Sequence, residues 1–223
     1  FTDGRAQAVG STGEVHSRSA MALGNVAYSV TLTWASSLLR DLEPQAKVPL
    51  FGTVPVELGM NGKEADLVAR LSAEPIYVEL FAAAFPEEAE AVTVENVARA
   101  LSTFQRTLIS GGSPFDRFAF GDDPEALSES AQRGLNLFNS SRLKCFRCHG
   151  GFALQDGVTF QGQLFEELEF HNTGLYNIGG SGAYPPGGEG LFAITELEAD
   201  TGRFRSPTMR NIAVTAPYMH DGS

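Results

Sequence analysis

The sequence predicts a mainly α-helical protein with long irregular loops, and two observations carry this prediction. Apolar residues recur at helical spacing in several stretches, whereas no stretch alternates apolar and polar residues for long enough to build a sheet. Glycine and proline, at 24 and 11 residues, gather between the periodic stretches. The chain has 223 residues, 43% of them apolar, which suffices for the core of one large domain or two small ones.

The first helices follow a loop-rich beginning. Residues 1–62 are rich in Gly, Ser and Pro. Apart from a short helix over 21–28, we expect this part to form loops that pack against a bound cofactor. Two helices are predicted next, over 64–72 and 76–85. Pro75 lies between them and separates them.

The clearest helix of the chain follows Thr93, which can cap it. It ends near 110–112, and its apolar residues recur at helical spacing: Val94, Val97, Leu101, Phe104 and Leu108. Residues 111–127 contain Pro114, Gly121 and Pro124 and are interpreted as a linker. We therefore expect two domains, 1–122 and 123–223.

The second domain begins with a helix over 128–138, for which Ser128 is the expected N-cap. Gly134 and Phe138 lie one turn apart on one face of this helix, a pattern that suits close packing on a second helix. Further along, residues 179–190 (GGSGAYPPGGEG) predict an irregular loop.

The two cysteines of the chain, Cys145 and Cys148, stand directly before His149 in the string CFRCH. Such a pair is found in redox sites, in zinc sites and in c-type haem attachment. A zinc site normally needs four ligands, and no second CxxC or HxxxH supplies them. A thioredoxin-like site needs a βαβ context, and the residues before Cys145 do not predict a strand.

Haem attachment accounts for both cysteines and for the histidine of that string. Two thiols three positions apart reach the two vinyl groups, and the adjacent imidazole becomes the proximal iron ligand. We therefore predict a covalent haem c on Cys145, Cys148 and His149, in a fold of two cytochrome c-like haem lobes. Because these thioether bonds are made outside the cytoplasm, we expect a periplasmic location.

The charge of the chain excludes several partners. The formal net charge is −11, so the surface is not suited to nucleic-acid phosphates or anionic lipid. No apolar run of 18 residues predicts a membrane span. The chain starts at Phe1 without a Met and stops at the turn-like MHDGS, so we expect it to be cut from a longer protein.

Several strings occur together and in order: FTDGR, NVAYS, TLTWASSLL, LEPQA through VELG, LKCFRCHGG, FHNTGLYN and RFRSPTMRNIAVTAPYMHDGS. As a set, over nearly the whole chain, they resemble the bacterial di-haem cytochrome c peroxidase and MauG superfamily. The resemblance is strongest to the MauG-like branch of methanobactin-associated di-haem enzymes.

The resemblance implies two haems c. A peroxide-reacting haem belongs to the N-terminal domain, and its CxxCH lies just before FTDGR in the family and so outside this chain. The electron-transfer haem belongs to the C-terminal domain and is the one attached here. Its distal ligand, a Met or a Tyr, lies beyond the C-terminal end, so that domain is incomplete.

The resemblance also implies catalytic residues. Glu57 matches the carboxylate over the peroxide-reacting iron, and a carboxylate in a dry pocket can move a proton between the two peroxide oxygens. Gln45 matches its polar neighbour, although the spacing between Trp34, Gln45 and Glu57 is slightly longer than expected. Trp34, the single tryptophan, matches the electron relay between the haems.

Further family positions concern the cofactors. Arg205 matches a haem-propionate arginine, with Arg203 and Arg210 as weaker candidates. A calcium site between the domains would use the Asn25 side chain and the backbone carbonyls of Thr215 and Pro217. Without the resemblance, Glu57 and Arg205 would be read as surface charges, Trp34 as core and Asn25 as a turn residue.

The histidines favour the MauG-like branch. Some family peroxidases carry a distal histidine on the first loop, and Ser11 occupies that position here. His16 is interpreted as a loop residue, and His171 and His220 as hydrogen-bonding residues near haem.

The resemblance therefore implies an enzyme that reacts with hydrogen peroxide and oxidises a periplasmic protein partner. That partner is a small cytochrome, a copper protein or a protein with a tryptophan to be modified, and family members are often homodimers. The alternative, from CFRCH alone, is a single-haem electron-transfer cytochrome c with Met209 or Met219 as second ligand.

Overall fold

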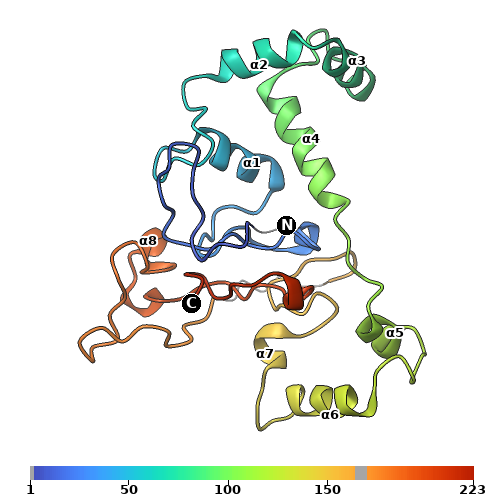
Figure 1. Ribbon diagram of the computed structural model, residues 1–223, viewed down its shortest axis with the longest axis vertical. Coiled ribbons are helices and arrows are strands. Elements are labelled where there is room, and N and C mark those ends of the chain that lie inside the picture. Colours follow the sequence, from blue (N-terminus) through green and yellow to red (C-terminus); the bar gives the residue numbers. More distant parts are fainter. Residues whose placement is uncertain (1–2, 164–169) are drawn as a thin grey trace.

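The computed structural model describes residues 3–163 and 170–223, so the FTDGR string begins outside the described residues. The helices divide into an upper group and a lower group around a layer of loops (Figure 1). The upper group comprises α1 (Leu42–Phe51), α2 (Glu64–Ser72), α3 (Pro75–Ala84) and α4 (Val94–Arg106). The lower group comprises α5 (Pro114–Phe120), α6 (Glu129–Phe138) and α7 (Phe146–His149), and α8 (Phe192–Thr195) lies at the opposite edge.

Three short 3-10 helices complete the regular structure: η1 (Val26–Tyr28), η2 (Glu198–Asp200) and η3 (Ile212–Val214). Within the described ranges, extended segments pair only through isolated bridges, such as Ser29 with Val158 and His171 with Phe204. Helices are thus the main regular secondary structure, which confirms the mainly α prediction. None of the described helices combines the length and apolar character needed to cross a bilayer.

The upper group is held by apolar packing between α1 and α4. Leu42, Ala46 and Leu50 are buried on α1 at helical spacing, and Val97 and Ala98 are buried on α4. Thr93 caps α4, because its Oγ1 accepts a hydrogen bond from Asn96 N at 3.1 Å. Apolar side chains at helical spacing on both helices, together with the cap of α4, therefore hold this part of the fold.

The helices predicted from periodicity are confirmed, with small shifts at their ends. Residues 64–72 form α2 as predicted, and α3 starts one residue early because Pro75 occupies its first turn. The α4 helix stops at Arg106, short of the predicted end. Ser128 caps α6 by accepting from Ala131 N at 3.3 Å, as predicted.

Three expectations need correction. The predicted helix over 21–28 is reduced to η1, because Asn25 adopts a left-handed backbone with φ 60° before it. The loop prediction for 1–62 missed α1, which tolerates Pro44 in its first turn and Pro49 near its end. The predicted linker contains α5, whose first turn is closed by a capping box between Ser113 and Asp116.

The loops of residues 19–40 hydrogen-bond to residues 150–220 across the middle of the molecule. Val30 N donates to Gly157 O at 3.0 Å, and Thr159 N donates to Tyr28 O at 2.7 Å. Two further bonds, both of 2.8 Å, run from Ser19 N to His220 O and from Arg205 N to Trp34 O. This interleaved layer lies between the two helix groups (Figure 1). The division at residues 122 and 123 stays a prediction.

Candidate functional site

The CFRCH string folds into the single turn of α7. His149 N donates to Cys145 O at 3.0 Å, so the two cysteines and the histidine lie on one face of that turn. Neither thiol forms a disulfide, and both cysteines are partly buried. Gly150 follows at once, and a Cβ there would stand 2.5 Å from Phe146 O, so only glycine allows this close reversal.

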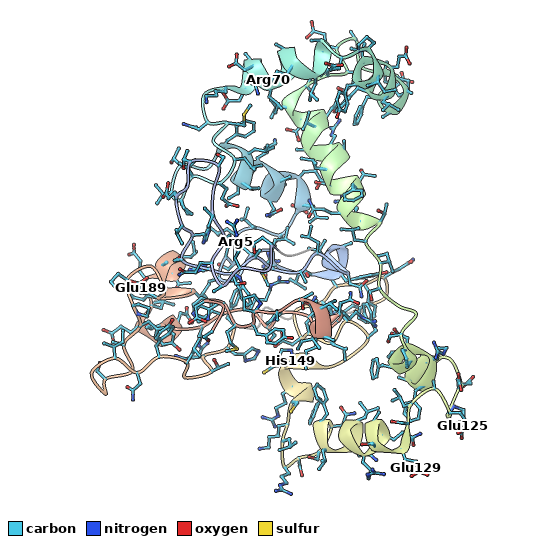
Figure 2. All side chains as sticks on the ribbon, in the orientation of Figure 1. Arg5, Arg70, Glu125, Glu129, His149 and Glu189 are labelled. Carbon is cyan, nitrogen blue, oxygen red and sulfur yellow. The ribbon has the colours of Figure 1, made fainter. Side chains whose placement is uncertain are left out.

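His149 borders a cavity of about 170 Å³ below the C-terminal segment, where Figure 2 shows its side chain. The wall opposite comes from the N-terminal loops and from residues 207–219, so three distant parts of the chain meet there. Most of the lining is apolar: Ala20, Met21, Ala22, Trp34, Pro207, Met209, Ile212, Pro217 and Met219. One imidazole beside an apolar wall suits a flat aromatic group bound through its metal, and the cavity of about 170 Å³ would cover part of such a group, since cofactor pockets usually measure about 300–1,000 Å³.

Buried polar atoms without partners mark the surroundings of this cavity. In the described parts of the chain, His149 Nδ1, His220 Nε2, Arg18 Nε and Arg205 Nη1 are buried and make no hydrogen bond. Buried polar groups are normally paired, and leaving one unpaired is costly. Two guanidinium groups with free buried donors indicate that an acceptor with negative charge belongs there.

Arg205 shows this most clearly. Its side chain is 6% exposed, and burial lowers its pKa to about 10, opposed by the negative charge of Asp156. Nε donates to Thr33 O at 3.1 Å and Nη2 contacts the sulfur of Met21 at 3.2 Å, which leaves Nη1. The residues around the turn therefore fit a haem c, whose thioethers, iron and propionates would engage the cysteines, His149 and Arg205.

The weaker propionate candidates are engaged elsewhere. Arg210 is 5% exposed and forms a bidentate pair with Asp116, at 2.9 Å from Nη1 and 2.6 Å from Nη2. This hydrogen bonding lowers the pKa of the Asp116 carboxyl far below its usual range. Arg203 is exposed and lies 3.5 Å from Asp200. Of the three, Arg205 is the one with an unused buried donor.

Trp34 forms part of the wall of the His149 cavity. The indole is buried, and its Nε1 donates to Ser19 O at 2.7 Å, which fixes the orientation of the ring. Its ring meets that of His220 edge-on at 6.4 Å, and His220 stacks on Phe204 at 3.6 Å. The tryptophan is thus both a core residue and a neighbour of the candidate haem site.

The other predicted catalytic residues lie apart from Trp34. Glu57 is partly buried and lines a separate cavity of about 120 Å³. Gln45 is partly buried on α1 and does not line that cavity. The structure therefore does not gather the predicted catalytic residues around one point of this chain.

The candidate calcium ligands are also divided. Thr215 and Pro217 line the His149 cavity, whereas Asn25 lines a cavity of about 400 Å³ next to α5. The amide of Asn25 holds Ser110 from both sides, since Oδ1 accepts from Ser110 N at 2.7 Å and Nδ2 donates to Ser110 O at 2.8 Å. Oδ1 retains one lone pair, and calcium binding by these three residues stays a prediction.

One pair was missed by sequence reasoning. His171 Nε2 contacts the Asp156 carboxylate, and the Cys148 thiol lies within 4.8 Å of both groups. Ser206 Oγ reaches the same carboxylate oxygen at 3.5 Å. His171 is thus a hydrogen-bonding residue, as predicted, and it lies close to Cys148, whereas no sequence signal indicated Asp156 as its partner.

Comparison with known proteins agrees with this geometry. Residues 1–124 match a family model described as di-haem cytochrome c peroxidase. The chain is 35% identical over its full length to the methylamine utilization protein MauG of Methylorubrum extorquens, of which it covers 56%. It is 32% identical to the cytochrome c551 peroxidase of Pseudomonas aeruginosa, over 89% of this chain and 52% of that protein.

Solved structures extend the comparison. A MauG-like protein associated with microbial copper homeostasis has a TM-score of 0.95 and 44% identity, covering all of this chain and 63% of that one. The di-haem peroxidase BthA of Burkholderia thailandensis, at 18% identity and a TM-score of 0.69, shares the fold. The chain spans roughly half to two thirds of the length of these proteins.

Proposed function

The chain belongs to the di-haem cytochrome c peroxidase family, and on that premise we propose that it is part of a haem c oxidoreductase that reacts with hydrogen peroxide and oxidises a protein partner. Family membership implies haem c as the cofactor. We propose two haems in the whole protein, one of them attached to this chain at Cys145 and Cys148. The observation that carries the proposal is that His149 of the CFRCH turn lines a mostly apolar cavity, with buried guanidinium donors nearby.

When bound, the haem at this site supplies an iron that changes oxidation state and so passes electrons on. His149 would hold the iron at the wall of its cavity, and Arg205 would donate to a propionate through Nη1. The mostly apolar lining would contact the faces of this group. These residues bind and orient the electron-transfer haem, and none of them moves a proton.

Glu57 is proposed to move the proton. Its carboxylate would take a proton from one peroxide oxygen and deliver it to the other, which would leave as water, while the peroxide-reacting haem would supply the two electrons that the cleavage of the O–O bond needs. Its partly buried position in a small cavity limits exchange with bulk solvent. Gln45 is proposed as a polar neighbour that orients the peroxide, in line with the family resemblance.

Trp34 is proposed to carry electrons between the haems. The indole is oxidisable, rigidly held by its bond to Ser19 O, and placed at the His149 cavity. A fixed aromatic ring divides one long electron transfer into two shorter ones. The partner is then oxidised at the surface of the protein.

We propose a periplasmic partner protein. A small cytochrome, a copper protein or a protein whose tryptophan is modified each fits the family. The resemblance to a MauG-like protein associated with copper homeostasis favours a partner linked to copper. Homodimerisation of the whole protein and a calcium ion at Asn25, Thr215 and Pro217 are further proposals from the resemblance.

A second function is favoured by one observation. Met209 and Met219 both line the cavity that His149 borders, so either thioether could be the second iron ligand of a single-haem electron carrier. Such a carrier would hold one haem in the whole protein, with six-coordinate iron that does not react with peroxide.

The test uses the whole haem-loaded protein mixed rapidly with hydrogen peroxide. We expect two haems per protein and a fast spectral change with peroxide. Glu57→Gln should slow that change about 10²- to 10⁴-fold, because it removes the proton acceptor. Glu74→Gln, a matched change at an exposed position outside both cavities, should leave the rate unchanged.

Two outcomes would contradict the proposal. A Glu57→Gln protein that reacts as fast as the parent would remove Glu57 from proton transfer. One haem per protein without any reaction with peroxide would instead establish the electron carrier.

A further inference from the structure

Aromatic rings continue from Trp34 toward the outside of the loop layer. Trp34, Tyr184 and Phe204 form one buried cluster. Tyr176 packs against this cluster and is itself only partly buried. His220 contacts both ends, since its ring centroid lies 6.4 Å from that of Trp34 and 6.2 Å from that of Tyr176. Ring contacts therefore connect the buried indole to a more exposed tyrosine.

A second path of ring contacts passes through Tyr184. Its ring centroid is 5.4 Å from that of Tyr176, in an edge-on arrangement, and 6.5 Å from that of Phe204. Phenol and indole groups can each lose one electron, whereas a phenyl ring does so much less readily. The redox chemistry of this cluster therefore depends on Trp34 and the two tyrosines.

The two tyrosines differ in the group that accepts their phenolic hydrogen. Tyr176 Oη donates to the carboxylate of Asp221, 45 positions further along the chain. Tyr184 Oη donates to the side-chain oxygen of Asn172 at 2.7 Å. A carboxylate can take up the proton itself, whereas a neutral amide oxygen accepts only the hydrogen bond. Tyr176 therefore has a base at its hydroxyl group, and Tyr184 has none among the described residues.

Backbone contacts hold the Asp221 carboxylate at the phenol. Its Oδ1 accepts from Ser223 N at 3.1 Å, which leaves Oδ2 for Tyr176. The residue between them, Gly222, adopts φ 74°, and a Cβ there would stand 2.2 Å from Ala6 O. Glycine thus lets this segment lie directly on the N-terminal loop. Tertiary packing therefore places the carboxylate beside the tyrosine.

At pH 7 the pair consists of a neutral phenol and an ionised carboxylate. The hydrogen bond to Asp221, together with burial, raises the pKa of the Tyr176 phenol above its usual value of about 10. Burial raises the pKa of the Asp221 carboxyl, but the hydrogen bonds from Tyr176 and Ser223 outweigh this effect, and the pKa lies below its ordinary value. A phenol that has lost an electron is a strong acid, so it then gives its proton to the adjacent carboxylate.

We infer that Tyr176 is a redox-active residue that reduces oxidised Trp34 when no partner protein is bound. One electron passes from the phenol to the indole through the ring contacts, and the phenolic proton passes to Asp221. Trp34 thereby regains its electron, Tyr176 becomes a neutral radical and Asp221 becomes a carboxylic acid. The oxidant is hydrogen peroxide, which oxidises Trp34 through the proposed reaction.

The inference rests on the proposed function, in which Trp34 carries electrons between the haems, and it deepens that function. An oxidising equivalent left on Trp34 would remain at the wall of the candidate haem site. Transfer to Tyr176 moves it to the partly buried side of the cluster. The cluster therefore protects the site when peroxide reacts in the absence of a partner.

The first experiment oxidises Trp34 without peroxide, in the whole haem-loaded protein. A light pulse at the long-wavelength edge of the indole band ionises tryptophan and leaves tyrosine unexcited. A Trp34→Phe variant identifies the part of the signal that comes from Trp34. Transient absorbance then follows the decay of the indole radical and the rise of the tyrosyl radical, and we expect the two to occur together in the parent.

Three variants locate the electron transfer. Tyr176→Phe keeps the ring and removes the hydroxyl group, so the tyrosyl signal should be lost and the Trp34 radical should persist longer. Asp221→Asn keeps a hydrogen-bond acceptor and removes the base, so the transfer should slow by about 10²-fold or more, as expected for loss of a general base. Tyr184→Phe, the matched control inside the same cluster, should keep the parental rate.

The second experiment adds hydrogen peroxide to the same proteins without a partner. Electron paramagnetic resonance of freeze-quenched samples detects the radical, and ring-deuterated tyrosine identifies a tyrosyl signal by narrowing it. We expect this signal in the parent and in Tyr184→Phe, and its loss in Tyr176→Phe. The haem absorbance of Tyr176→Phe should also bleach faster over repeated additions of peroxide.

The outcomes separate the inference from the proposed function. A Trp34 radical that decays equally fast in the parent and in Tyr176→Phe, with equal thermal stability of the two proteins, would overturn the inference. A parental rate in Asp221→Asn would also overturn it, because the proton would then have another acceptor. Transfer after the light pulse in a protein that never reacts with peroxide would overturn the proposed function and leave the electron transfer from Tyr176 to Trp34 standing.

Discussion

The upper helix group and the layer of loops beneath it are stabilised in different ways. In the α1–α4 group, apolar side chains pack at helical spacing and a local hydrogen bond caps α4. In the loop layer, buried arginines, histidines and serines surround a small aromatic cluster of Trp34, Tyr184 and Phe204. Several of these polar atoms have no partner in the described residues.

The difference shows where the described part of the fold leaves buried charge unpaired. The interface between α1 and α4 is apolar, although Ser102 Oγ on α4 is buried without a hydrogen bond and Leu80 and Phe104 of the same group are exposed. A loop layer with unpaired buried guanidinium groups lacks a counter-charge, and a haem with two propionates would supply one. We therefore expect haem to stabilise the loop layer much more than the helix group.

The largest effect should come from removing both attachment thiols. The Cys145→Ala, Cys148→Ala double variant should carry no covalent haem at α7. The backbone amides of residues 150–220 should lose most of their protection against hydrogen exchange. Peptides from α1 and α4 should keep most of their protection, because their packing does not involve the cavity. Hydrogen exchange of the whole protein, measured by mass spectrometry, reports the protection of the loop layer and of the helix group in one experiment.

The matched control is Ser141→Ala, which changes an exposed residue next to the same turn. It should keep its haem and its exchange pattern. Equal loss of protection in the helix group and the loop layer of the double variant would contradict the distinction drawn here.

The next largest effect is expected at the buried Arg210–Asp116 pair, which joins the C-terminal segment to α5. Arg210→Ala leaves the buried Asp116 carboxylate without its cationic partner, with only Ser113 still donating to it, and should lower the free energy of unfolding by about 3–5 kcal/mol. Chemical denaturation of the haem-loaded protein measures this. A loss below about 1 kcal/mol would show that α5 and the C-terminal segment are held by other contacts.

The same pair has a defined pH dependence. Because the folded pKa of Asp116 lies far below its unfolded value of about 3.9, its stabilising contribution is complete above that value and declines as pH falls below it. The stability difference between the parent and Asp116→Asn should therefore be constant from pH 5 to 7 and shrink below pH 4. A difference that instead grows on acidification would contradict the assignment.

This contrast also explains what the sequence could predict. The helices α2, α4 and α6 were predicted because periodic apolar residues and capping residues are local signals. The α1 and α5 helices were missed because Pro44, Pro49 and Pro114 were interpreted as loop signals. Pro44 and Pro114 stand in first turns, where proline is tolerated, and Pro49 costs α1 one backbone hydrogen bond near its end.

The site was only partly predictable, because local patterns indicate local structure and not contacts between distant residues. The CFRCH turn is local and its fold followed from its spacing. In contrast, the meeting of Tyr176 with Asp221 joins residues 45 positions apart, and that of Asp116 with Arg210 joins residues 94 positions apart. Such contacts depend on how the loops close, which no periodicity encodes.

A smaller effect, on the reduction potential, should distinguish substitution of Arg205 from substitution of the exposed Arg203. Arg205→Gln removes a buried positive charge beside the proposed haem site and should lower the reduction potential of that haem by tens of millivolts, where about 59 mV corresponds to a tenfold change for one electron. Arg203→Gln, exposed and paired with Asp200, should leave the potential nearly unchanged. Spectroelectrochemical titration measures the reduction potential of each variant. Equal shifts in the two variants would argue against a special role for Arg205.

The smallest effect is expected in the helix group. Thr93→Ala removes the α4 cap and should cost about 1 kcal/mol of unfolding free energy while leaving the haem content and peroxide rate unchanged. Thermal unfolding with a haem assay on the same samples measures both quantities. A loss of haem in this variant would show that the helix group and the loop layer are not independent.

The most direct measurement is the mass and visible absorbance of the proteolytic peptide that contains residues 145–149, prepared from the whole protein produced with haem c maturation. We predict a coloured peptide heavier by one haem, attached through both sulfurs. A colourless peptide with two free thiols, or one that holds zinc before digestion, would contradict the account.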